Sequence, residues 1–400
     1  MLETLIALIA ARSALELYTD VELAAYRLNV PSLFGLAMLA LAAWLVIARR
    51  RTLQWHPLLF GWAAWLATLL PSVALALSLH GAQGFLAVRE WIRLLSIPGV
   101  FLVAYNCPIG RRGRSGIELL FLVLVVPLLA AIVQMATGAG AYDSDGSHRV
   151  MGTLFHANSL AMFLVFFVGL SYWKLTGGGG WPWLILIAIE LVVFVATLSL
   201  GGILMLVVLG AWIFFLEGTR GRVRVVALGA FLALVLAADG PARTKLRTMQ
   251  SFAPQSVRES VQGNYVDSVG WRFKNWSQLI SAWRQRPLFG WGLNASQVVN
   301  PETATGVGFA PHNDLLRSLV ETGVFGLSAY VAFVGFCLYE MLRAAWPRAA
   351  VSLAWILTGI FLASQGASLG DNVAANSAFQ VCLWSAWGFA LSRSPQNSTG

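Results

Sequence analysis

Residues 181–216 read WPWLILIAIELVVFVATLSLGGILMLVVLGAWIFFL, and this stretch decides the fold class. It contains two consecutive apolar runs, 181–198 and 200–216, each close to the roughly 20 residues that a helix needs to cross a bilayer. The whole chain of 400 residues is 58% hydrophobic and only 11% charged, which is too apolar for a soluble domain of this size to hide in one core. We therefore predict a protein whose main solvent is lipid.

Comparable apolar runs recur along the chain, separated by short polar or Gly/Pro-marked breaks. They predict an all-α integral membrane protein with about twelve transmembrane helices. The first run is the least regular because Arg12, Glu16 and Asp20 interrupt it, so it could instead lie along the membrane surface. Residues 1–11 lack the basic region and the cleavage site of a secretory signal peptide. The expected spans are 3–19, 31–48, 57–79, 86–105, 117–137, 154–173, 181–198, 200–216, 223–238, 321–343, 350–367 and 373–391.

Basic side chains orient these spans, since the short cytoplasmic loops of membrane proteins are enriched in Lys and Arg. With a cytoplasmic amino terminus and an even number of spans, the basic residues at 49–51, 111–114, 174, 220–224, 343–348 and 393 all face the cytoplasm. The predicted organisation is transmembrane helices 1–9 in residues 1–238, a large periplasmic loop with interfacial helices in 239–320, and helices 10–12 with a short cytoplasmic tail in 321–400.

The large loop contains a predicted helix, because large apolar side chains recur there at helical spacing and Arg272 extends the same face. The run Pro287–Gly292 then ends this helix in a turn. A helix so rich in tryptophan at a membrane boundary is expected to lie along the interface. The apolar positions are Trp271, Trp276, Leu279, Ile280 and Trp283.

Residues 311–326, PHNDLLRSLVETGVFG, combine polar groups with the entry into a late span. Pro311 suits the first turn of a helix, which places His312 and Asn313 at a helix N-terminus, where unpaired N–H groups attract anions. Polar groups at a membrane boundary are costly unless they are paired or hydrated, so function is the default hypothesis here. A simple capping or interfacial role for His312 fits the physics of the stretch equally well.

The same stretch predicts an amphipathic helix. Its apolar face at 315, 316, 319 and 320 leaves His312, Arg317 and Glu321 to point elsewhere. Gly323 and Gly326 permit close helix packing as the chain re-enters the bilayer.

Three motifs in the chain are similar to motifs of the O-antigen ligase and polymerase superfamily. The pattern His-Asn-x-x-Leu-x-x-x-x-Glu-x-Gly-x-x-Gly, which begins at His312, resembles the superfamily signature. Residues 149–161, which include Arg149 and Asn158, resemble its Arg-x-x-Gly-x-x-x-x-x-Asn-x-Leu-Ala motif. Arg272 with Trp276, followed by 287–292, is similar to the run that precedes the histidine.

One departure from the family pattern lies in the middle of the chain. Many relatives have Ser-Arg-Gly where this chain has Ser199-Leu200-Gly201. Any role of that arginine must here be absent or be supplied by Arg89, Arg93 or Arg149.

The resemblance implies a glycosyltransferase of the bacterial inner membrane, with a GT-C-like architecture and an active site that faces the periplasm. Its donor would be an undecaprenyl-diphosphate-linked glycan, its acceptor a sugar hydroxyl of lipid A–core, and its expected activity that of an O-antigen ligase. His312 would be the base that takes the hydroxyl proton, with Glu321 or Asp371 to orient or assist it. If His312 works alone, the displacement is single and inverts the anomeric carbon.

The diphosphate leaving group calls for cations rather than a proton, and arginine binds phosphate oxygens in a bidentate fork. Arg89 and Arg93 lie one turn apart at the outer end of the fourth span, so they share a face and could clamp one diphosphate, while Glu90 and Trp91 point away. Snorkelling arginines at a helix end are the simpler alternative. The expected substrate-binding residues are Arg89, Arg93, Arg149, Arg272, Asn158, Asn313 and Arg317.

No cofactor and no metal are expected. Asp143-Ser144-Asp145 resembles an acidic pair that holds a divalent metal in other glycosyltransferases, but the loop lacks further acidic ligands and is typical of a turn before Gly146.

Other functions stay open. A polymerase would add the same donor to another lipid-linked glycan, and a protein O-oligosaccharyltransferase usually carries an extra domain after the last span. A transporter of lipid-linked glycans is the alternative from another class, but it calls for ionisable residues along a pathway, whereas here they cluster at one membrane face. A nucleic-acid partner is not expected.

Overall fold

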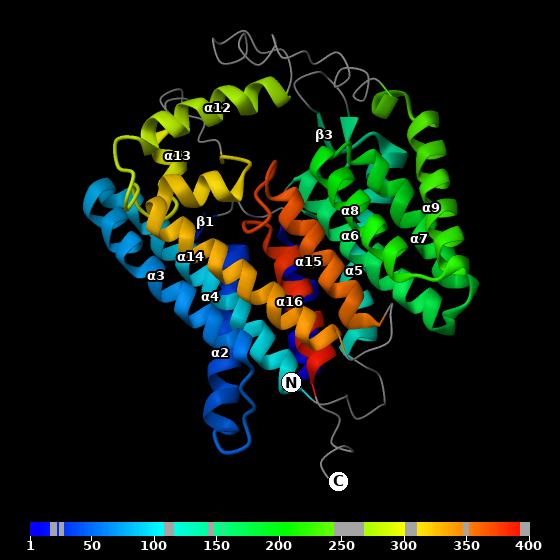
Figure 1. Ribbon diagram of the computed structural model, residues 1–400, viewed down its shortest axis with the longest axis horizontal. Coiled ribbons are helices and arrows are strands. Elements are labelled where there is room, and N and C mark those ends of the chain that lie inside the picture. Colours follow the sequence, from blue (N-terminus) through cyan, green and yellow to red (C-terminus); the bar gives the residue numbers. More distant parts are fainter. Residues whose placement is uncertain are drawn as a thin grey trace.

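The computed structural model describes residues 1–16, 22–23, 28–107, 116–142, 148–154, 156–243, 268–300, 310–346 and 352–392. This part of the chain is a bundle of helices (Figure 1). Two short antiparallel pairs interrupt it, β1 (Glu22–Leu23) with β2 (Leu28–Asn29) and β3 (Ala141–Tyr142) with β4 (His148–Arg149). The prediction of an all-α protein is confirmed at this level.

Each of the expected spans contains a helix. The helices are α1 (Leu2–Ala14), α2 (Val30–Ala48), α3 (Pro57–His80), α4 (Phe85–Tyr105), α5 (Gly116–Thr137), α6 (Ala157–Lys174), α7 (Trp181–Ala196), α8 (Leu200–Leu216), α9 (Thr219–Ala238), α14 (Asp314–Ala345), α15 (Leu353–Ala367) and α16 (Ser377–Leu391). Two short helical turns, η3 (Gly81–Gly84) and η4 (Leu175–Gly179), follow α3 and α6. The expected large loop contributes α12 (Ser268–Trp283) and α13 (Ser296–Val299).

Five helical segments among the described residues are long and apolar enough to cross a membrane: Pro57–Tyr105, Gly116–Thr137, Ala157–Gly179, Thr219–Ala238 and Asp314–Ala345. Shorter apolar helices lie in α2, α7, α8, α15 and α16. These helices fit a multi-pass membrane protein, while the count of twelve spans stays a prediction.

Helix α6 lies at the centre of the bundle and α9 at its edge. Almost the whole surface of α6 is buried, including Phe163, Phe166 and Phe167, because α7, α8 and α15 pack around it. In contrast, Val226 and Leu234 of α9 are 60% and 68% exposed. A helix that is apolar all round is stable only inside a core or in lipid, so α6 and α9 represent the two cases.

Helix α1 is part of the bundle and does not lie apart along a surface. It spans 13 residues, ends before the expected position 19, and packs against α5, α2, α4 and α16. Arg12 of α1 and Glu16, two residues after its end, are each 7% exposed. Two of the three charges that make this segment irregular in sequence are therefore buried inside the protein, while Asp20 lies outside the described residues.

Helix α14 begins at Asp314 and is kinked at Gly323, where φ is 66°. The kink exposes backbone groups that residues 287–292 satisfy: Val324 N donates to Pro287 O (2.9 Å), and Gly292 N donates to Glu321 O (2.9 Å). A Cβ at Gly323 would overlap the carbonyl group of Leu288. The close approach expected at this glycine is present, but its partner is the turn after α12 and not a neighbouring helix.

Helices α12 and α13 lie at one end of the bundle, together with β3, as Figure 1 shows. The amino terminus and the turn after α2 lie at the opposite end, the lower one in this view. The residues that carry the candidate site lie at the end that α12 covers.

Candidate active site

His312 forms a hydrogen bond with Asp371. Its Nδ1 lies 3.2 Å from Asp371 Oδ1. The imidazole is 23% exposed and the carboxylate 7% exposed, so the pair is open on the histidine side only. His312 has a left-handed backbone, with φ of 50°, which turns the chain just before α14.

The cap of α14 is Asn313, and Pro311 lies outside the helix. The Asn313 side chain is the N-cap of α14 and accepts a hydrogen bond from Leu316 N (2.9 Å), so the helix starts at Asp314, later than expected. Pro311 O instead accepts a hydrogen bond from the Trp276 indole of α12 (2.7 Å). His312 is therefore held between a cap on one side and α12 on the other.

The charge on Asp371 fixes the proton position on His312. Burial on its own would raise the pKa of Asp371, but the hydrogen bond and charge of His312 lower it. The Asn372 N–H and the charge of Arg272 also lower it, and the net pKa lies below the ordinary value. An ionised carboxylate only accepts hydrogen bonds, so His312 Nδ1 carries the hydrogen and Nε2 of the neutral ring keeps its lone pair.

The loop between α15 and α16, residues 368–376, is hydrogen-bonded to the start of α14. Ser368 O accepts from Asp314 N (2.9 Å) and Leu369 O accepts from the Asn313 side chain (2.9 Å). Ala374 N donates to Asp314 Oδ2 (2.8 Å). The loop is thus attached to the start of α14 on both sides of Asp371.

Two aromatic rings lie beside His312. Trp271 of α12 meets it edge to face, with 5.7 Å between ring centroids. His156, the N-cap of α6, lies with its ring centroid 6.4 Å away. The sequence alone does not indicate His156, because its proximity to His312 depends on how α6 packs against the α15–α16 loop.

Arg149 and Asn158 are brought together as their shared motif suggests. Arg149 Nη2 donates to Asn158 Oδ1 (2.6 Å), and Nε donates to Thr197 O (2.8 Å). Thr197 is the C-cap of α7 and lies three residues before Leu200, the first residue of α8 and the position of the missing family arginine. Of the three arginines considered as substitutes, Arg149 is the one with a hydrogen bond to this segment among the contacts the structure describes.

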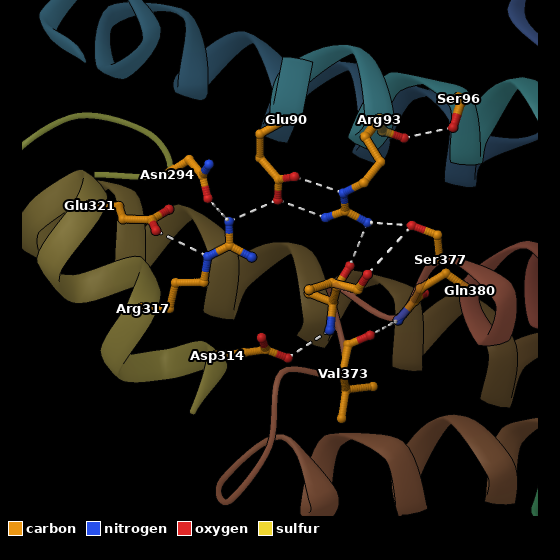
Figure 2. A network of polar contacts seen from close by, with 12 residues as sticks. Glu90, Arg93, Ser96, Asn294, Asp314, Arg317, Glu321, Val373, Ser377 and Gln380 are labelled. Carbon is orange, nitrogen blue, oxygen red and sulfur yellow. Dashed lines mark hydrogen bonds and ion pairs between the residues drawn. The ribbon is translucent and has the colours of Figure 1, made fainter. Parts of the chain in front are cut away.

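A second cluster of charges lies between α4 and α14 (Figure 2). Arg93 donates through Nε and Nη2 to both carboxylate oxygens of Glu90, at 2.7 Å each. Arg317 donates to the same Glu90 (2.8 Å) and, through Nε, to Glu321 (3.0 Å). Glu321 also accepts from Ser296 of α13 (2.6 Å).

This cluster contradicts the orientation expected for Glu90 and gives Glu321 partners other than His312. The expectation that Glu90 points away from its neighbours is wrong, because its carboxylate joins Arg93 to Arg317. The contacts of Glu321 are with Arg317 and Ser296, whereas the carboxylate on His312 is that of Asp371. Arg89, one turn from Arg93, is half-buried on α4.

Arg93 also reaches the α15–α16 region. Its Nη1 donates to Ala374 O (2.9 Å) and to the Ser377 hydroxyl (3.2 Å), as Figure 2 shows. Ala374 therefore binds Asp314 through its N–H and Arg93 through its carbonyl. The charge cluster and the His312–Asp371 pair are held by one loop.

The acidic loop at 143–146 lies outside the described residues. Arg272 is described, on α12, and its charge acts on Asp371.

A comparison with family models finds a match, which covers the middle of the chain. Residues 183–331 match the model described as O-antigen ligase, a family of glycosyltransferase-like ligases. A search of curated proteins finds no match. The match contains α12, the 287–292 turn, His312 and the charged start of α14. The resemblance inferred from the motifs is confirmed in this part of the chain, because residues 183–331 match the O-antigen ligase model.

Proposed function

We propose that this protein is an O-antigen ligase of the bacterial inner membrane, which transfers polysaccharide from undecaprenyl diphosphate to a sugar hydroxyl of lipid A–core at the periplasmic face. The observation that carries the proposal is the His312–Asp371 pair, 3.2 Å apart and open on the histidine side. A base oriented by a buried carboxylate is the arrangement that activates a hydroxyl for attack.

The reaction is a single displacement. The acceptor hydroxyl gives its proton to His312 Nε2 as its oxygen attacks the anomeric carbon of the donor sugar. The bond between that carbon and the phosphate oxygen breaks, and undecaprenyl diphosphate leaves with the electron pair. The product therefore has the inverted anomeric configuration.

Arginine charge stabilises the departing diphosphate. Arg149 and Arg272 are the best placed, since Arg149 reaches the segment before α8 and Arg272 acts on Asp371. Arg93 and Arg317 are bound to Glu90 and Glu321, so most of their charge is balanced within the protein. We assign those two to holding the start of α14, and keep Arg89 as a further diphosphate contact.

The charge pattern supports the orientation. The turn after α2, which contains the basic run at 49–51, lies at the end of the bundle opposite α12 and α13. Because basic loops face the cytoplasm, the end that carries His312 faces the periplasm.

The test is reconstitution of the purified protein in liposomes with an undecaprenyl-diphosphate glycan and lipid A–core, with products separated on a gel. We expect glycan on lipid A–core from the wild type, loss of more than about a hundredfold in His312→Ala, and full activity in EDTA. If the lipid-linked glycan lengthens while lipid A–core stays bare, the protein is a polymerase. If undecaprenyl diphosphate is never released, the protein is not a transferase. A product with retained configuration overturns the single displacement.

A further inference from the structure

His156 is an exposed imidazole at the site that the proposed mechanism does not use. His156 is the N-cap of α6, and the centroids of the His156 and His312 rings are 6.4 Å apart. The two residues are far apart in sequence, so their approach is a result of the fold.

The hydrogen bonds of the two histidines place their protons differently. Asn158 N donates to His156 Nδ1 (3.1 Å), so this nitrogen carries the lone pair and Nε2 of the neutral ring carries the hydrogen. On His312 the order is reversed, because Nδ1 donates to Asp371 and Nε2 keeps the lone pair. The site thus has one imidazole that accepts a proton and one that donates a hydrogen bond.

The surroundings of His156 favour an anion. Asn158 donates its backbone N–H to the His156 imidazole, and its side-chain oxygen accepts a hydrogen bond from Arg149 Nη2 (2.6 Å). The N-terminal end of α6 adds the positive end of a helix dipole on the same side. The His312 side of the site instead carries the carboxylate of Asp371.

We propose that His156 binds the diphosphate of the donor, by donating a hydrogen bond from Nε2 to a phosphate oxygen, with Arg149 beside it. This inference rests on the proposed function and assigns the two histidines to opposite partners. His312 serves the attacking hydroxyl and His156 serves the leaving group, where negative charge grows during the reaction.

If His156 served only as the cap of α6, substitutions would have the opposite effects. Two substitutions therefore distinguish the binding role from the capping role. His156→Asn keeps a side-chain acceptor for the Asn158 N–H, because asparagine is among the best N-caps, but it removes the Nε2 donor. His156→Gln places an amide NH2 near the position of Nε2 and weakens the cap. Transfer is measured at varied donor and varied acceptor, and binding of undecaprenyl diphosphate alone is measured by calorimetry in detergent.

We expect His156→Asn to raise the KM for donor and the Kd for undecaprenyl diphosphate by about tenfold to a hundredfold, with the KM for lipid A–core unchanged. His156→Gln should bring the KM for donor and the Kd for undecaprenyl diphosphate most of the way back to the wild-type values. The inference is overturned if His156→Asn behaves like the wild type while His156→Gln is impaired, or if only the KM for acceptor changes. Failure of the proposed function looks different: the wild type then transfers nothing to lipid A–core, while the binding measurement still tests His156.

Discussion

At the scale of single residues, the base depends on a carboxylate that is distant in sequence. We predict that Asp371→Asn lowers kcat by about a hundredfold to ten-thousandfold. An asparagine amide can donate to His312 Nδ1 and so stabilise the tautomer whose Nε2 carries a hydrogen and cannot act as a base. Single-turnover rates with saturating donor measure this effect, and the KM for donor should stay within about threefold of the wild type. A variant with unchanged kcat would show that Asp371 does not orient the base.

The charge of Glu90 should be costly to remove, because two arginines share it. Glu90→Gln leaves Arg93 and Arg317 facing each other with much less negative charge between them, and breaking a buried ion pair in this way costs about 3–5 kcal/mol. The expected result is a large fall in the thermal unfolding midpoint in detergent.

The control for Glu90 is Glu118→Gln. Its partner Lys174 is also bound at 2.8 Å, but the Glu118 side chain is 43% exposed, against 12% for Glu90. Exposed pairs contribute about 0–1 kcal/mol, so this variant should unfold near the wild-type midpoint. Equal losses in both variants would contradict the buried role of Glu90.

Sequence alone proposed candidate residues, but it could not predict which residues they contact. His312, Arg149 and Asn158 follow from motifs, and the structure brings the last two together. The choice between Glu321 and Asp371 could not be made, because both are carboxylates near the outer ends of helices and only packing decides which one meets His312. Glu90 was misplaced because spacing along an isolated helix ignores Arg317, which approaches from α14.

At the scale of elements, the kink in α14 depends on a single glycine. We predict that Gly323→Ala destabilises the protein strongly, since the residue has a φ of 66° and its Cβ would overlap the Leu288 carbonyl. Activity should fall with stability, because the kink places Glu321 and hence Arg317. The thermal midpoint and transfer rate are measured on the same preparation.

Gly335→Ala is the matched control in the same helix. A Cβ at Gly335 meets nothing within 4 Å, and alanine is the better helix former by about 1 kcal/mol. This variant should be as stable as the wild type or slightly more stable. A tolerated Gly323→Ala would mean that the turn at 287–292 does not hold the kink.

The helices themselves were predictable because lipid imposes a simple rule: apolar runs of sufficient length become helices. Their ends were less predictable. The start of α14 moved from the expected position to Asp314 because Asn313 caps the helix with its side chain. The role of 287–292 as the support of the kink was not predictable, since it depends on backbone groups that become unpaired only when the helix bends.

At the scale of the whole molecule, orientation is the prediction to test. We expect a cysteine introduced at Arg50 to react with a membrane-impermeant maleimide only after the inner membrane is opened. A cysteine at Gln285, in the turn after α12, should react in cells whose outer membrane alone is permeabilised. The native thiols Cys107, Cys337 and Cys382 are buried and should give little background. The reverse pattern would place the site in the cytoplasm and exclude the proposed acceptor.

The loop between α15 and α16 sets a rule for protein engineering. Exchanging the 239–320 region between relatives is an obvious way to alter which sugar is accepted, but such a graft would bring its histidine without the carboxylate partner, which lies 59 residues further along the chain. The transplanted histidine would then meet a foreign loop. A functional chimera has to inherit residues 368–377 from the same parent as the histidine, so the two segments form one unit of exchange despite the two helices between them.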